Sequence, residues 1–94
     1  MSHWSGCRIE VRAGGELEFA DDDCDVRIES GKLTLTYFDD EGPVVFIGRE
    51  ASGGFELVCR SRPRTATLRR TGATLHGTWK ERDQSGSWTI RLPR

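Results

Sequence analysis

Acidic residues gather in the stretch "ADDDCD", where carboxylates alternate at Asp21, Asp23 and Asp25. Alternating carboxylates of this kind begin the calcium-binding loop of an EF-hand. The complete loop also needs a glycine after the third acid and a glutamate at the twelfth position, where this chain has Val26 and Lys32. The stretch is therefore predicted to be a solvated turn without a specific metal site.

Five arginines gather in the segment "CRSRPRTATLRR", and their guanidinium groups suit phosphates and carboxylates. They are Arg60, Arg62, Arg64, Arg69 and Arg70. A nucleic-acid binder usually adds exposed aromatic rings or a basic overall charge, whereas the net charge of this chain is -1. The sequence therefore argues against nucleic acid and favours an acidic protein partner, or the acidic half of a second copy of the chain.

The three cysteines, Cys7, Cys24 and Cys59, show no CxxC spacing, and His3 and His76 do not complete a zinc pattern with them. We therefore predict reduced thiols, no bound metal and no cofactor. Cys7 and Cys59 fall at apolar positions, where a thiol packs as a small hydrophobic group. Cys24 lies in the acidic stretch and is predicted to be the thiol that reagents reach.

Catalytic arrangements are not visible in the sequence. Cys59 and His76 are predicted on opposite faces of their strands, and no serine lies in a strained turn. No glycine-rich loop leads into a helix that would hold a phosphate. We therefore predict that the protein is not an enzyme, and keep an enzyme with a site assembled from distant strands as a third hypothesis.

The chain has 94 residues, enough for one domain over residues 1–94 with one core. Residues 1–58 hold five basic and thirteen acidic residues, and residues 59–94 hold nine and two. The two halves either neutralise each other side by side or form a dipolar docking surface. No apolar run has the length of a signal peptide or a membrane span, so we expect a cytoplasmic protein without a membrane segment.

Short runs of alternating apolar and polar residues follow one another, with turn residues about every ten positions. This pattern predicts an all-β protein of antiparallel hairpins. The expected strands cover residues 6–13, 16–21, 25–30, 33–39, 43–50, 54–61, 65–70, 74–82 and 86–93. Eight or nine such strands leave two exposed edges in an open sheet, so a small closed up-and-down barrel is our first prediction. A two-layer sandwich and a coiled open sheet are the alternatives.

Tight turns between these strands place apolar residues opposite apolar residues. The predicted pairs are Ile9 with Phe19, Phe19 with Val26, Ile28 with Leu33, Tyr37 with Val44, Phe46 with Leu57, Leu68 with Leu75 and Trp79 with Trp88. The inward side chains are bulky, which predicts a filled interior. They are Ile9, Val11, Leu17, Phe19, Val26, Ile28, Leu33, Leu35, Tyr37, Val44, Phe46, Phe55, Leu57, Leu68, Leu75, Trp79, Trp88, Ile90 and Leu92.

Apolar side chains also occupy outward positions on three successive strands. These residues are Phe38, Val45, Ile47 and Val58, and Arg49 and Arg60 lie at their rim. Monomers seldom leave a contiguous apolar patch in water, so the pattern predicts a homodimer or protein-partner interface. The alternatives are a bulge in "GPVVFIGRE" that reverses the two faces locally, or a second layer that covers this sheet.

Trp79 and Trp88 flank the turn in "GTWKERDQSGSW". A cross-strand pair of tryptophans stabilises a hairpin, and the same register places the Arg64 guanidinium over the Trp79 indole. The alternative is a small-ligand site at the mouth of the barrel. Its candidate residues are Trp79, Trp88, Tyr37 and Arg64.

The closing hairpin, "TLHGTWKERDQSGSWTIRL", resembles the ends of calycin-type barrels, the group of the lipocalins and the avidin-like proteins. This resemblance implies an up-and-down barrel that binds a small molecule. Lipocalins carry Gly-x-Trp on the first strand, whereas Gly77 and Trp79 lie on the penultimate one, so no binding residue is transferred to this chain. The whole pattern is also similar to small uncharacterised bacterial barrel families.

These observations favour a non-enzymatic barrel that acts by binding another protein or itself. A small-molecule binding module is the second hypothesis.

Overall fold

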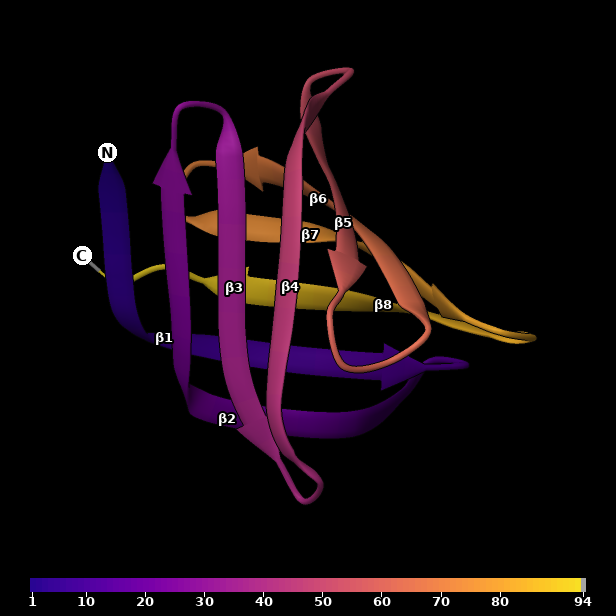
Figure 1. The fold of residues 1–94 in the computed structure, drawn as a ribbon. Coiled ribbons are helices and arrows are strands. Elements are labelled where there is room, and N and C mark those ends of the chain that lie inside the picture. The colour runs from indigo at the N-terminus through magenta and orange to yellow at the C-terminus, as the bar shows by residue number, and fades with distance from the viewer. Residues whose placement is uncertain (94) are drawn as a thin grey trace.

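Eight antiparallel strands follow one another around a closed barrel in the computed structural model, which describes residues 1–93 (Figure 1). They are β1 (Ser2–Ala13), β2 (Glu16–Glu29), β3 (Lys32–Asp39), β4 (Gly42–Ala51), β5 (Gly54–Cys59), β6 (Arg64–Thr71), β7 (Thr74–Glu81) and β8 (Gln84–Arg91). The all-β meander and the closed barrel predicted from the sequence are confirmed. None of the described segments is a helix that could cross a membrane.

The barrel closes because β1 pairs with β8 as well as with β2. Ile9 lies opposite Ile90 and Val11 opposite Trp88 across this seam, so inward apolar residues meet there. The last strand thus covers the edge that the first strand would otherwise expose. The two-layer sandwich and the open sheet are excluded by this pairing.

The acidic stretch is the middle of one long strand and not a turn. β2 continues from Glu16 to Glu29, and its second half pairs with the N-terminal part of β1, where Trp4 lies opposite Val26. Figure 1 shows this part of β1 upright beside β2, before the strand bends beneath the barrel. The predicted turn at residues 22–23, and with it the ninth strand, is wrong because the early residues of β1 supply a partner for β2.

Several hairpins pair two residues away from the predicted register. The pairs of Ile28 with Leu33 and Tyr37 with Val44 are confirmed. The wrong pairs are replaced by Val11 with Phe19, Gly48 with Leu57, Arg70 with Leu75 and Trp79 with Gly86. The turns after β4 and β6 lie one residue later than the predicted pairs require, at Ser52 and Gly72, and the turn after β7 lies one residue earlier, at Arg82. All three positions adopt a positive φ.

A shift of two residues keeps every side chain on its face, because side chains in a strand alternate with a period of two. The predicted core is therefore confirmed in spite of the register errors. All but three of the predicted inward side chains are buried, and they pack with Cys7, Cys24, Cys59 and Ala66. The exceptions are Phe19 and Ile28, which are half-buried, and Leu17, which is 52% exposed because a register shift between Val11 and Arg12 places it opposite the exposed Arg12.

Two inward glycines allow the strands to pack closely. A Cβ atom at Gly77 would lie 2.0 Å from the carbonyl oxygen of Thr67, and a Cβ atom at Gly86 would lie 1.9 Å from that of Arg12. Both distances are far inside van der Waals contact, and both neighbours are backbone atoms that cannot move away alone. Glycine at such positions marks the close approach of another strand.

We predict that Gly77→Ala destabilises the barrel by about 2–4 kcal/mol, because the added methyl group overlaps the Thr67 carbonyl. Urea unfolding followed by tryptophan fluorescence measures the change. Ser87→Ala, which removes an exposed side chain from the adjacent strand, is the control and changes the free energy of unfolding by less than about 0.5 kcal/mol. Equal stability of the two variants would contradict the prediction.

Candidate functional site

Each of the two core tryptophans crosses a neighbouring strand at a glycine. Trp88 of β8 lies opposite Gly77 of β7, and its Nε1 donates a hydrogen bond of 2.9 Å to the Thr67 carbonyl of β6. Trp79 of β7 lies opposite Gly86 of β8, and its Nε1 donates a hydrogen bond of 3.1 Å to the Arg12 carbonyl of β1. Both side chains are only 2% exposed. The indoles are therefore structural ties that link four consecutive strands.

The tie from Trp88 changes the local ladder between β6 and β7. Regular pairing stops after Ala66 with Trp79 and resumes at Arg69 with His76. Between these pairs, the Thr78 amide donates to the Thr67 hydroxyl at 3.3 Å. The carbonyl of Thr67 accepts the hydrogen bond from the Trp88 indole. The hydroxyl of Thr67 therefore accepts the hydrogen bond from β7.

Arg64 is the buried charged residue among the core side chains, at 9% exposed. Its guanidinium lies 4.3 Å from the centre of the Trp79 ring, and its Nε donates to Glu81 Oε1 at 2.9 Å. The predicted stacking on Trp79 is confirmed, although the residue directly opposite Arg64 is Glu81. The charge that could attract an anionic ligand is thus already paired within the protein.

A second ion pair lies near the end of β3. Arg62 donates from both terminal nitrogens to the two carboxylate oxygens of Asp39, at 2.7 Å and 2.8 Å. These hydrogen bonds hold the pKa of Asp39 below its ordinary value of 3.8 and raise that of Arg62. Burial raises the pKa of neighbouring Tyr37 to about 12, so its hydroxyl is neutral at physiological pH.

The four residues predicted for a ligand site all lie in the filled interior. Trp79, Trp88 and Tyr37 are each 2% exposed, and Phe46 packs against Trp88 with ring centres 4.8 Å apart. Within residues 1–93, no buried side-chain nitrogen or oxygen lacks a hydrogen-bond partner. The two indole nitrogens and the Nε of Arg64 are therefore already hydrogen-bonded within the protein.

The predicted outward patch lies on β3, β4 and β5. Phe38 and Val58 are 57% and 55% exposed, and Val45 and Ile47 are half-buried. Ile47 lies directly opposite Val58, and β3 pairs with β4 without a register shift, so the bulge considered for this segment is absent. The single closed sheet also leaves no second layer over these residues. We call these four residues the outer apolar patch.

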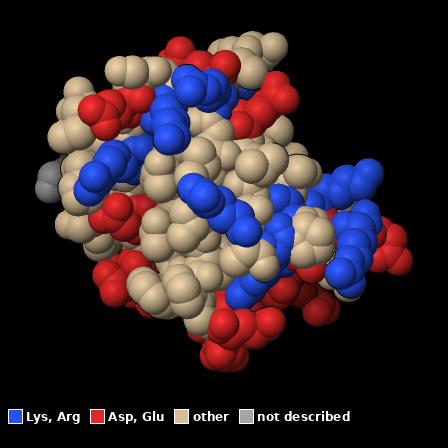
Figure 2. All heavy atoms as spheres, in the orientation of Figure 1, with Lys and Arg blue, Asp and Glu red and all other residues tan. Residues whose placement is uncertain are grey.

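Charged residues border the outer apolar patch at both ends of its strands. Lys32 and Arg49 face each other at one end, and Asp40 and Glu41 occupy the exposed turn at the other. Figure 2 shows an uncharged area in the middle of this face, crossed by one basic side chain and bordered below by acidic ones. Arg60 follows β5, and its amide bonds to the Val45 carbonyl, so this predicted rim residue lies beside the patch.

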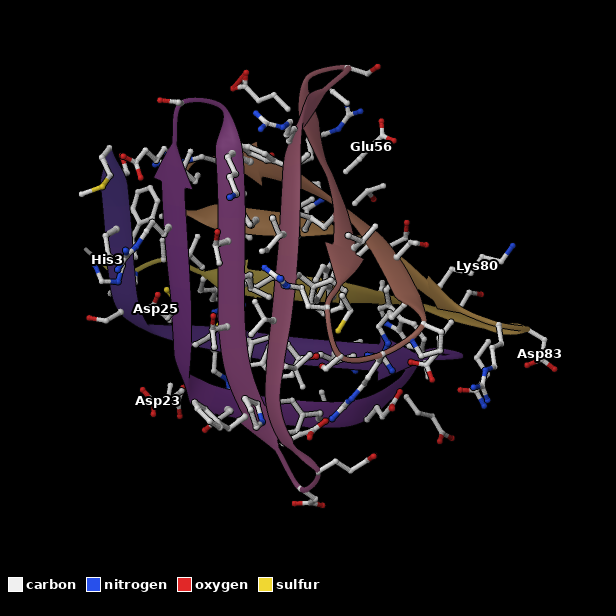
Figure 3. All side chains as sticks on the ribbon, viewed as in Figure 1. His3, Asp23, Asp25, Glu56, Lys80 and Asp83 are labelled. Carbon is white, nitrogen blue, oxygen red and sulfur yellow. The ribbon has the colours of Figure 1, made fainter. Side chains whose placement is uncertain are left out.

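The remaining charged residues mainly contact other residues of the barrel. Within the acidic stretch, Asp25 contacts His3 at 2.6 Å, and Figure 3 shows the two side chains together. Asp22 receives a hydrogen bond from Arg8 at 3.2 Å. Arg70 covers the Trp4 ring at 5.1 Å. The five arginines thus do not form one basic surface, and the described residues contain no group of three metal-ligating side chains.

The sequence missed the environment of Cys24. It is fully buried and lies directly opposite Cys7, because β2 is continuous and turns this side chain inward. The prediction that Cys24 is reachable is wrong. Cys59 is buried and His76 exposed, so these two residues do not form a nucleophile and base.

Comparison with known protein families, with curated proteins and with solved structures finds no match to this chain.

We predict that Asp39→Asn makes the free energy of unfolding depend less strongly on pH in the acidic range. The Asp39 carboxylate has a lowered pKa when folded, so its contribution is complete above its unfolded value of 3.8 and is lost as the pH falls through the folded value. The variant should lose about 1–2 kcal/mol near pH 7 and approach the parent protein at low pH. Urea unfolding over a series of pH values tests this. Asp40→Asn, at the next residue and in the exposed turn, is the control and should follow the parent curve.

Proposed function

We propose that this barrel acts by binding and not by catalysis, and that it forms a homodimer through the outer apolar patch. The observation that carries the proposal is the exposure of Phe38 and Val58 beside Val45 and Ile47 on one continuous face. A large contiguous apolar surface on a small soluble protein usually marks an interaction site. A filled interior also leaves the outer surface as the place for recognition.

The rim charges favour a second copy of this chain as the occupant. The basic end of the patch, with Lys32 and Arg49, and the acidic end, with Asp40 and Glu41, lie on opposite sides of the apolar residues. A two-fold axis that lies in the interface and runs across the strands places the basic end of each copy over the acidic end of the other. The same face is therefore complementary to itself in charge as well as in hydrophobicity.

The small-molecule hypothesis has less support. The up-and-down order of eight strands agrees with the calycin-type resemblance at the level of architecture. Its candidate residues, however, are buried, and their indole and guanidinium groups bond internally. Binding in the cytoplasm through the outer face remains our proposal, and a small ligand at the barrel mouth is the alternative.

We predict that Ile47→Asp converts the dimer to a monomer, because a charge would be buried in the interface without a partner. Light scattering after size exclusion should give about 21 kDa for the parent protein, twice the 10.6 kDa of one chain, and about 10.6 kDa for the variant. Thr89→Asp, on the outer face of β8, is the control and should remain dimeric. A parent protein that is monomeric at every concentration, with circular dichroism showing a folded chain, contradicts the proposal.

A charge exchange tests whether the partner is a second copy. Arg49→Glu and Glu41→Lys should each weaken dimerisation by about tenfold, because each places like charges together across the two-fold axis. The double variant restores opposite charges at both sites and should recover most of the affinity. Sedimentation equilibrium measures the dissociation constants. If the losses of dimer affinity simply add in the double variant, the basic end of one copy does not meet the acidic end of the other.

A further inference from the structure

Cys7 and Cys24 face each other across the first two strands. They are direct partners in the register of β1 with β2, and both side chains are fully buried in the core. Opposed Cα atoms in an antiparallel ladder lie about 4.5–5.5 Å apart, within the range of about 4.4–6.8 Å that a disulfide spans. The backbone therefore already holds the two cysteines at bonding separation. Burial is the main cause of the raised pKa of Cys24, and the nearby Cys7 thiol is the second cause.

Within the described part of the chain, the strand around Cys7 is irregularly paired and lacks a second neighbouring strand on its N-terminal side. Over residues 1–93, β8 pairs with β1 only from Arg8 to Ala13, so β2 is the only strand that pairs with the earlier residues of β1. Register shifts occur on both sides of Cys7, and Gly6 adopts a positive φ of 67°. Irregular pairing along an edge lowers the free energy of local opening.

We propose that Cys7 and Cys24 form an intramolecular disulfide when the protein meets a disulfide oxidant such as oxidised glutathione. One protein thiolate attacks the glutathione disulfide, forms a mixed disulfide and releases one glutathione thiolate, which takes up the proton that the cysteine lost. The second cysteine then attacks the protein sulfur of the mixed disulfide and releases the second glutathione in the same way. Two protein thiols are oxidised and one glutathione disulfide is reduced to two thiols.

The third cysteine is placed so that it stays free. Cys59 lies opposite Phe46 on β4, and its Sγ lies 3.6 Å from the Ser61 hydroxyl. Because burial raises the pKa of Cys7 and Cys24, their thiolates form in the opened segment and not in the closed barrel. The reaction is therefore slow in the folded state, and its product ties the N-terminal part of β1 to β2.

Incubation of the purified protein with oxidised glutathione tests the proposal. Intact mass spectrometry should show a loss of two hydrogen atoms, and alkylation in denaturant should modify one cysteine of the three. Tryptic mapping should join the peptide of Cys7 to that of Cys24. The melting temperature should rise by about 5 °C or more, because the bond restricts the unfolded chain.

Cysteine variants distinguish the Cys7–Cys24 disulfide from other oxidation products. Cys24→Ala should abolish the internal disulfide, and Cys59→Ala, the matched control, should retain it. Tryptic mapping of the parent protein identifies the bridge even where a variant fails to fold. A bridge that includes Cys59, a final product of glutathione adducts or cross-linked dimers, or three free thiols after prolonged incubation would each overturn the proposal.

Discussion

Two indole hydrogen bonds, each passing over a glycine, hold the barrel in its closed form. Trp88 reaches from β8 over Gly77 to β6, and Trp79 reaches from β7 over Gly86 to β1. A regular ladder joins only adjacent strands, whereas each of these bonds joins strands separated by another. The Trp79 bond crosses the seam where β1 meets β8, and the Trp88 bond ties β8 to β6. The absent side chains at the two glycines are as necessary as the rings, because a methyl group at either position would overlap the carbonyl that accepts the bond.

This arrangement has a consequence for function. The rings, Arg64 and Tyr37 occupy the interior that a ligand-binding barrel would leave open, and the indole nitrogens and the Nε of Arg64 hydrogen-bond within the protein. The binding that we propose therefore uses the outer surface. The outer apolar patch lies on β3, β4 and β5, away from the strands that the two tryptophans tie together. A substitution in the patch can therefore test the proposed association without disturbing closure.

The sequence predicted faces more reliably than registers. Alternation fixes which side chains point inward, and it survives a shift of two residues, so nearly all of the core and the whole outer apolar patch could be named in advance. The exact turn positions depend on residues such as Ser52 and Arg82 that adopt a positive φ. Serine and arginine seldom adopt this conformation, so the residue types do not predict it. Cys7 and Cys24 pair because β2 continues through the acidic stretch, where apolar and polar residues do not alternate and the sequence therefore does not predict a strand. The bonds from the indoles join residues far apart in the chain, so no local pattern encodes them.

Hydrogen exchange of the tryptophan indole groups tests the central claim most directly. In nuclear magnetic resonance spectra recorded after transfer to deuterated water, the Nε1 protons of Trp79 and Trp88 should exchange only through opening of the barrel, with protection close to that of the most stable backbone amides. The half-buried Trp4 provides an internal reference and should exchange much faster. Exchange of all three indole protons at the same fast rate would contradict the account, because it would mean that the two ties do not hold the barrel closed.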